Sequence, residues 1–138
     1  YDPVQKAVAA IHAGWRGTVS KIVVETVQQM QLSFGTNSND CHCYVGTCID
    51  RHSFEVGDEV AENFASHLKD YDKDKQKYFV DLKEANKEQL VACGIPSHQI
   101  QISAYSTVLD NRDYFSYRKE NGITGRMLLV IGMKATSL

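Results

Sequence analysis

One short segment carries residues that can bind a metal, move a proton and hold an anion. Its sequence is His12-Ala13-Gly14-Trp15-Arg16-Gly17, between an apolar run that predicts a buried strand and a stretch that predicts a helix. Open α/β sheets bind ligands at the carboxyl ends of strands, where the His12 imidazole can hold a metal or transfer a proton near neutral pH. Arg16 offers a fork of donors for phosphate or carboxylate, and Gly14 and Gly17 allow a positive φ or a close backbone approach. The alternative is that the segment has only a structural role, as a strand-to-helix turn with a polar cap.

A second segment rich in aromatic and basic residues lies near the carboxyl end. Residues 110–126 read DNRDYFSYRKENGITGR, within a polar and aromatic stretch between two expected strands. Loops longer than about 12 residues in compact domains are usually functional or disordered, and the aromatic content argues against disorder. Arg118 and Arg126 could bind an anion, and side chains such as Tyr117 could stack on a flat base. The alternative is a surface hairpin with aromatic residues packed on the sheet and arginines in solvent.

The four cysteines offer weaker candidates. Cys41-His42-Cys43, with Cys48 and His52 nearby, could form a local zinc cluster, but the spacing is not the paired C-x-x-C of a structural site. The alternative is a buried strand that uses small sulfur side chains. Cys48 could also be a nucleophile with His52 as its base, although such pairs are recognised by geometry and not by closeness in sequence.

Composition limits the possible classes of protein. The chain has 138 residues, 43% apolar and 23% charged, with a formal charge of −2. These values predict one globular domain with a real core. Without a basic excess, generic nucleic-acid binding is disfavoured, and no apolar run approaches the roughly 18 residues of a membrane span. No signal peptide is visible, and reduced cysteines are expected, so we predict a cytoplasmic protein. The first residue, Tyr1, leads us to expect a piece of a longer protein.

Hydrophobic spacing and turn residues predict the secondary structure. Strands are expected at 6–13, 41–45, 78–81, 100–104 and 126–134. Helices are expected at 18–34, 54–68 and 82–93, with a solvated charged run at 69–77. Gly35 and Gly94 should end two of the helices, while Ser53 should cap a third and place Glu55 in its first turn. The pattern predicts a single α/β domain over residues 1–138, in which helices pack on a mixed sheet.

Three stretches, taken in order, resemble one family. They are IHAGWRG at 11–17, G-x-C-I-x4-FEVG at 46–57 and YFSYRKENGITGRM at 114–127. The chain resembles the YfiH-like, laccase-domain proteins over about residues 6–133. Members of that family were once described as multicopper polyphenol oxidases. They are now regarded as zinc-containing purine nucleoside phosphorylases that also deaminate adenosine. The resemblance implies the carboxyl-terminal portion of a larger layered fold, with the amino-terminal half missing, and a purine nucleoside and phosphate as substrates.

The resemblance also implies a zinc site, of which this chain supplies one of the three protein ligands. The family's zinc has three protein ligands: a His in Q-V-H-G, a Cys in T-A-D-C and the His of HAGWRG. Only the last has a counterpart here, His12; Cys48 does not match the ligand Cys. The chain also has Ser106-Thr107 where the family often has Cys-Thr. Three ligands and one open position are typical of a catalytic zinc, which lowers the pKa of bound water toward about 7.

We therefore expect His12 and Arg16 to be catalytic residues, with His12 as a metal ligand. Arg16, Arg118 and Arg126 are the candidates for the phosphate, and Arg118, Arg126 and Tyr117 are expected to bind substrate. The expected substrates are adenosine, inosine, guanosine and methylthioadenosine.

Two alternatives remain open. A copper-dependent oxidation of phenols would need a trigonal set of His and Cys ligands, and the chain has no H-x-H pattern. The chain could also be a catalytically inactive fragment, because one zinc ligand of three should bind zinc weakly. The oligomeric state is left open.

Overall fold

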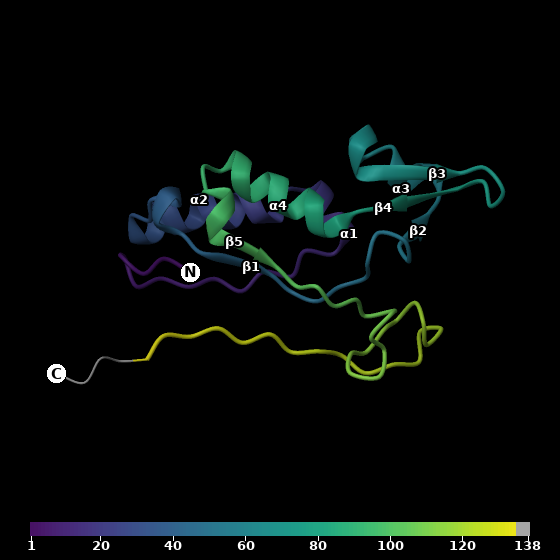
Figure 1. The fold of residues 1–138 in the computed structure, drawn as a ribbon. Coiled ribbons are helices and arrows are strands. Elements are labelled where there is room, and N and C mark those ends of the chain that lie inside the picture. Colours follow the sequence, from purple (N-terminus) through teal and green to yellow (C-terminus); the bar gives the residue numbers. More distant parts are fainter. Residues whose placement is uncertain (135–138) are drawn as a thin grey trace.

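The computed structural model describes residues 1–134. Its helices and strands confirm the predicted mixed α/β class (Figure 1). In chain order they are α1 (Trp15–Val19), α2 (Ile22–Phe34), β1 (Cys43–Val45), β2 (Glu55–Val56), α3 (Asp58–Ala61), β3 (Lys69–Asp72), β4 (Lys77–Val80), α4 (Leu82–Ala92) and β5 (Ile100–Ile102). Short 3₁₀ turns occupy Ser38–Asp40, Ser66–Leu68 and Ser97–Gln99. None of the helices in these residues is both long and apolar enough to cross a membrane.

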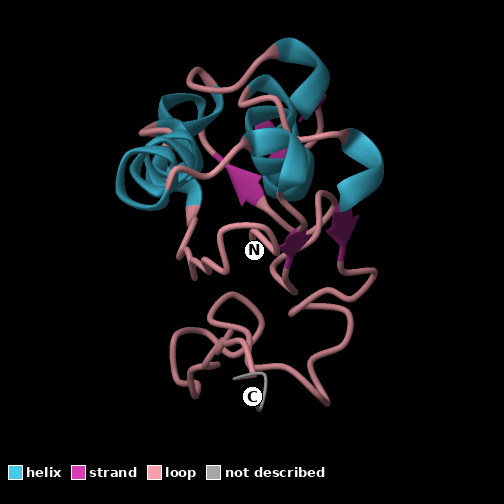
Figure 2. Ribbon diagram, turned by 90° about the vertical axis from the view of Figure 1, so that its left-hand side faces the viewer, coloured by secondary structure: helices cyan, strands magenta, loops and turns pink. Residues whose placement is uncertain are grey.

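The strands form two small sheets. β1 and β5 are parallel, with Tyr44 opposite Gln101, and α2 and α4 cover one of their faces. Buried residues of that layer, including Val27, Leu90 and Ile100, form one hydrophobic cluster. Figure 2 shows the helices gathered on one side of the molecule and the long carboxyl-terminal loops on the other. The second sheet is antiparallel, in the order β2-β4-β3.

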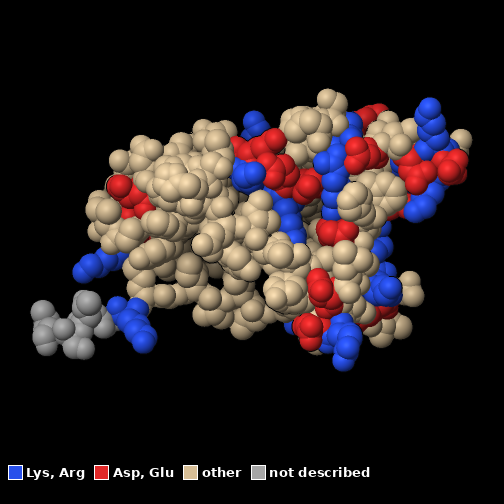
Figure 3. Space-filling model, viewed as in Figure 1, with Lys and Arg blue, Asp and Glu red and all other residues tan. Residues whose placement is uncertain are grey.

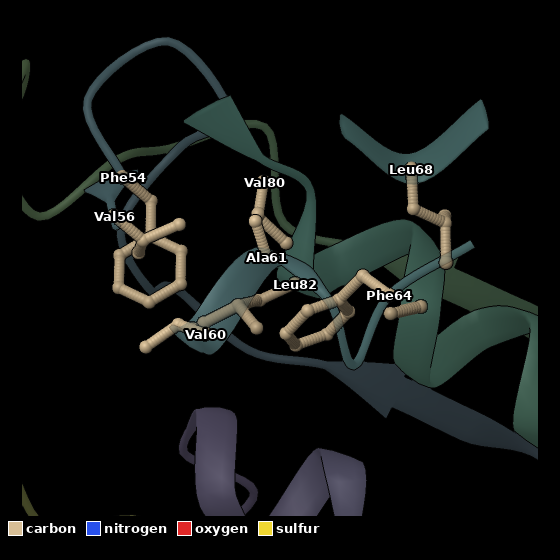
Figure 4. Close-up of a cluster of buried hydrophobic side chains, with 9 residues drawn as sticks. Phe54, Val56, Val60, Ala61, Phe64, Leu68, Val80 and Leu82 are labelled. Carbon is tan, nitrogen blue, oxygen red and sulfur yellow. The ribbon is translucent and has the colours of Figure 1, made fainter. Parts of the chain in front are cut away.

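A second cluster fills the space beneath the antiparallel sheet (Figure 4). It consists of Phe54, Val56, Val60, Ala61, Phe64, Leu68, Val80, Leu82 and Ala85. We call it the Phe54 cluster. Trp15 and Val19 of α1 pack against it, so this core directly supports the segment that carries His12 and Arg16.

The expected helix at 18–34 is in fact two helices. Ser20 ends α1, where its N–H donates to the Arg16 carbonyl at 2.9 Å, and Lys21 takes a left-handed conformation with φ 57°. The break lets Trp15 face the Phe54 cluster, whereas Val23 faces the cluster under β1 and β5. Helical spacing continues across the break because both halves bury apolar side chains.

The expected helix at 54–68 is wrong. The segment contains β2, the short α3 and a 3₁₀ turn, although the apolar residues that suggested a helix do all enter the Phe54 cluster. Pairing of β2 with β4 overrides the helical spacing. Glu55 therefore lies in a strand, and Ser53 instead donates its N–H to Asp50. Part of the charged run at 69–77 is also structured, since β3 pairs with β4.

The helix at 82–93 and its end at Gly94 are confirmed, and the structure adds a capping residue at its start. Asp81 caps α4 by accepting a hydrogen bond from the Glu84 N–H at 2.9 Å, and Gly94 follows with φ +91°. Gly35 ends α2 with φ +69°, a conformation that costs glycine little. The strands expected at 41–45 and 100–104 form as the shorter β1 and β5, and the one at 78–81 forms within β4.

Two expected strands do not form, at 6–13 and 126–134. Asp2 and Ala7 close a tight turn by exchanging backbone hydrogen bonds, and the chain then continues to Gly14 without a ladder. Residues 126–134 also join no sheet within the described chain. A β-strand depends on a neighbouring backbone, so an apolar pattern alone cannot create one.

Candidate functional site

The His12 imidazole lies over the glycine turn that follows it. Its Nε2 is 3.4 Å from the point that a Cβ on Gly14 would occupy, and a Cβ on Gly17 would meet Ile22 at 3.3 Å. Neither glycine has a positive φ. Close approach is therefore the reason for these glycines. The turn presents both His12 and Arg16 as exposed side chains.

Buried hydrogen bonds fix this turn to α4. Thr18, which is only 1% exposed, donates its hydroxyl to the Gly14 carbonyl at 3.1 Å and accepts from Asn86 Nδ2 at 3.0 Å. Gln89 Nε2 also donates to the Thr18 carbonyl at 2.8 Å. The position of the His12–Arg16 turn thus depends on residues about 70 positions later in the chain.

We expect Thr18→Val to lower the free energy of unfolding by about 1–3 kcal/mol. The substitution keeps the side chain nearly the same size but removes the buried hydroxyl, which leaves the Asn86 amide without its acceptor. Urea titrations of the chain and the variant measure the change. Thr26→Val is the matched control, since Thr26 makes the same hydroxyl-to-carbonyl bond, to Ile22, on an exposed surface. Equal effects of the two substitutions would contradict a special role for Thr18.

Arg16 is held by an aromatic ring. Its guanidinium carbon lies 4.8 Å from the centre of the Trp15 ring, and Trp15 packs on the Phe54 cluster. A guanidinium stacked in this way keeps its N–H groups available for a planar anion. The geometry is suited to binding phosphate or carboxylate.

The long loop places its two arginines differently. Arg118 Nη1 donates to the Glu55 carbonyl at 2.9 Å, and the guanidinium lies 5.7 Å from the Phe54 ring centre. Arg126 lies 5.8 Å from the ring centre of the exposed Tyr117 and donates to the carbonyls of Thr124 and Gly125. The structure brings Tyr117 and Arg126 together, while Arg118 docks the loop on β2. Trp15 and Arg118 therefore contact one cluster from positions 103 residues apart.

Hydrogen bonds within the loop stabilise its conformation. Glu120 Oε1 accepts from Asn111 Nδ2 at 2.6 Å and from the Ser116 N–H at 3.2 Å. The nearby hydroxyl of Thr124 and the Asn111 amide lower the pKa of Glu120. As predicted, the segment is a loop without regular strands or helices, and it is ordered by polar contacts.

A carboxylate that the sequence did not single out ties the start of this loop to the segment that follows β1. Asp50 accepts hydrogen bonds from the Ser106 hydroxyl and the Ser53 N–H, and the Ser106 N–H donates to Asp110 at 2.7 Å. Burial raises the pKa of Asp50, but the hydrogen bonds from Ser106 and Ser53 outweigh it and leave that pKa below its usual value. In the sequence, the one hint of this contact was Ser106-Thr107, which stands where the family often has Cys-Thr.

We expect Asp50→Asn to destabilise the protein at neutral pH, on the order of 1 kcal/mol, because hydrogen bonds to a charged acceptor are lost. Since the native pKa is lowered, the contribution of Asp50 is present above the unfolded value of about 4 and is lost as the pH falls through the native pKa. Urea unfolding at pH 7 and near pH 2.5 should show the difference from the parent chain shrinking in acid. Asp74→Asn, in the exposed β3–β4 turn, is the control. A difference that stays constant with pH would contradict the assignment.

The cysteine candidates find no support. All four thiols are free, and among residues 1–134 no group of three or more His, Cys, Asp or Glu side chains is placed to hold one metal ion. Burial raises the pKa of Cys48, which opposes the thiolate that a nucleophile needs. Taken alone, the imidazole of His12 does not fit a complete zinc site, which needs three protein ligands.

The comparisons with known proteins agree on a family. Residues 1–134 match the family model described as multi-copper polyphenol oxidoreductase laccase. A purine nucleoside phosphorylase of Bacteroides thetaiotaomicron is 40% identical over 134 residues, covering 93% of this chain and 50% of that protein. Purine nucleoside phosphorylase YlmD of Bacillus subtilis is 36% identical, covering 97% of this chain and 50% of the relative.

Solved structures have the same fold. YfiH of Bacillus licheniformis superposes with a TM-score of 0.81 at 32% identity, over 88% of this chain and 48% of that one. YlmD of Geobacillus stearothermophilus gives a TM-score of 0.74 at 30% identity, over 83% and 44%. The chain spans about half the length of the relatives it matches. The family match and these superpositions confirm the predicted resemblance: the chain belongs to the multi-copper polyphenol oxidoreductase laccase family, which includes the YfiH and YlmD proteins.

Proposed function

We propose that this chain supplies part of the active site of a purine nucleoside phosphorylase. The observation that carries the proposal is the turn at 12–17, where one anchored segment exposes an imidazole and a stacked guanidinium. The names of the Bacteroides and Bacillus relatives support the reaction class. Because those relatives are about twice as long, the activity is proposed for a completed protein.

The proposed reaction joins a phosphate oxygen to the sugar C1′ as the bond from C1′ to the purine nitrogen breaks. The leaving purine takes a proton. Arg16, together with Arg118 or Arg126, would hold the phosphate, because guanidinium groups bind such oxygens in bidentate pairs. Tyr117, which is 68% exposed, offers a ring face on which a purine can stack. Inosine, adenosine, guanosine and methylthioadenosine are the proposed nucleosides.

We assign His12 to a zinc site that residues outside this chain complete. One imidazole does not fix metal geometry, and an open catalytic site needs its other ligands to retain the ion. We also propose that the completed protein deaminates adenosine, which requires the same completed zinc site.

A copper-dependent phenol oxidation is the second candidate, because the description of the matching family model favours it. A copper site of the blue type also needs several His and Cys ligands. His12 could be one of them, so the identity of the reaction has to come from an assay.

The test uses a chimera, in which this chain is joined to the part of the Bacteroides relative that lies outside the match. Purified chimera is incubated with inosine or adenosine, with and without phosphate, and the free base is measured. We expect base release that depends on phosphate. Oxidation of a phenol by the copper-loaded chimera, without phosphate-dependent base release, would favour the second candidate and overturn the first.

A further inference from the structure

One side of α4 carries polar side chains that reach both segments of the candidate site. Lys83, Asn86 and Gln89 follow one another at intervals of three residues, so they are neighbours along the helix surface. Asn86 and Gln89 donate hydrogen bonds to Thr18 and thereby hold the turn at 12–17. Lys83 takes no part in that anchor. Its contacts lie where the chain leaves β5.

The Lys83 ammonium binds two backbone carbonyls just beyond β5. Its Nζ donates to the Ser103 carbonyl and to the Tyr105 carbonyl, each at 2.7 Å. In Figure 1 the chain leaves β5 and runs into the long loop (green) at the lower right. Hydrogen bonds from a charged donor are shorter and stronger than those from a neutral one. Lys83 therefore holds the stretch of backbone that leads into the loop at 110–126.

The same stretch of backbone is tied to the end of β1. Ser103 is only 5% exposed, and its hydroxyl forms a hydrogen bond with the Thr47 hydroxyl at 2.8 Å. The Ser103 N–H donates to the Val45 carbonyl, also at 2.8 Å. A buried carbonyl without a donor is unfavourable. Removal of the Lys83 ammonium should therefore shift or loosen the backbone here.

Charge alone does not distinguish Lys83 from its neighbours on the helix. In Figure 3, Lys, Arg, Asp and Glu side chains gather over α4. Lys87, one turn further along, donates to Glu84 Oε1 at 2.9 Å in a pair within the helix. Lys83 differs because its partners are backbone groups 20 and 22 residues away in the chain. Lys87 is therefore a matched control for Lys83.

We propose that Lys83 is a positioning residue, which sets the place of the loop at 110–126 relative to the turn at 12–17. This role rests on the proposed function, since both segments are to bind the same phosphate. The helix holds the turn that carries Arg16 through its other two polar side chains, and it holds the start of the loop through Lys83. One helix thus fixes the distance between guanidinium groups that come from separate segments. A displacement of about 1 Å between such groups can lower a rate by about 100-fold.

Steady-state kinetics of the chimera test this role. Lys83→Met keeps the apolar stem of the side chain and removes the ammonium, and it should raise the KM for phosphate by about tenfold. Lys83→Gln, measured beside it, should change this KM in the same direction, so the test does not depend on one variant folding. Lys83→Arg retains charged donors and should stay within about threefold of the parent. Lys87→Met should leave the KM unchanged. A general loss of folded protein would lower kcat and leave the KM for phosphate as it was.

Amide hydrogen exchange of the same chimeras tests the structural step without any activity. Lys83→Met should speed exchange at residues 103–110 by about tenfold, because their backbone loses an anchor, while the turn at 12–17 keeps its rate. Lys87→Met should change neither segment. A chimera that releases no base but shows these exchange rates would support the positioning of the loop and refute the proposed function.

Two results would overturn the role of Lys83. The first is an active chimera in which Lys83→Met and Lys83→Gln leave the KM for phosphate unchanged. The second is equal changes of exchange in Lys83→Met and Lys87→Met, which would make the effect a general consequence of altering α4.

Discussion

His12→Ala in the chimera should remove stoichiometric zinc and lower phosphorolysis by at least about 100-fold, since even residues behind the metal ligands can cost 10–100-fold. The imidazole is exposed on a turn fixed by Thr18 and has no companion ligands within the described chain. Losing it would leave the proposed site with two protein ligands. Zinc content by mass spectrometry of the metal and rates of base release measure both effects.

The control for this substitution is His52→Ala. His52 is also exposed, and its removal should leave both zinc and rate unchanged. It also tests the alternative in which His52 serves Cys48 as a base. A chimera that keeps a full zinc equivalent after His12→Ala would disprove the ligand assignment.

The second large effect is that purified residues 1–138 should show no phosphorolysis of adenosine or inosine, with or without added zinc. The chain supplies one imidazole where an open zinc site needs three ligands, and its residues 127–133 expose apolar side chains that favour association. Assays of the chain beside the chimera at equal concentration measure the difference. Turnover by the chain alone at the chimera's rate, surviving further purification and lost on His12→Ala, would show that the site is complete within these residues.

The parts of the fold that local chemistry determines could be predicted from the sequence. The helix α4 begins close to the expected position and is followed by the left-handed Gly94 as expected, and polar residues made 105–125 a loop. The segment at 54–68 could not be predicted, because its apolar residues recur every four positions while β2 pairs with a strand about 20 residues later. Apolar spacing reports burial, and here burial was achieved with a different local structure.

The sequence likewise predicted only part of the candidate site. His12 and Arg16 stand out by residue type and by the glycines around them. The contacts that hold them do not, because Thr18 meets Asn86 across 68 residues and Asp50 meets Ser106 across 56. Such pairs carry no local pattern. The strand predicted at 126–134 failed for a further reason, since the described chain offers it no ladder partner.

The most direct test of the account is a crystal structure of the chimera with zinc and phosphate. We predict a His12 imidazole nitrogen about 2.0–2.1 Å from the zinc. We also predict Arg16, with Arg118 or Arg126, about 2.7–2.9 Å from phosphate oxygens. A zinc ion held without His12, or guanidinium groups of Arg16, Arg118 and Arg126 on opposite faces of the molecule, would contradict the central claim that these segments form one phosphorolytic site.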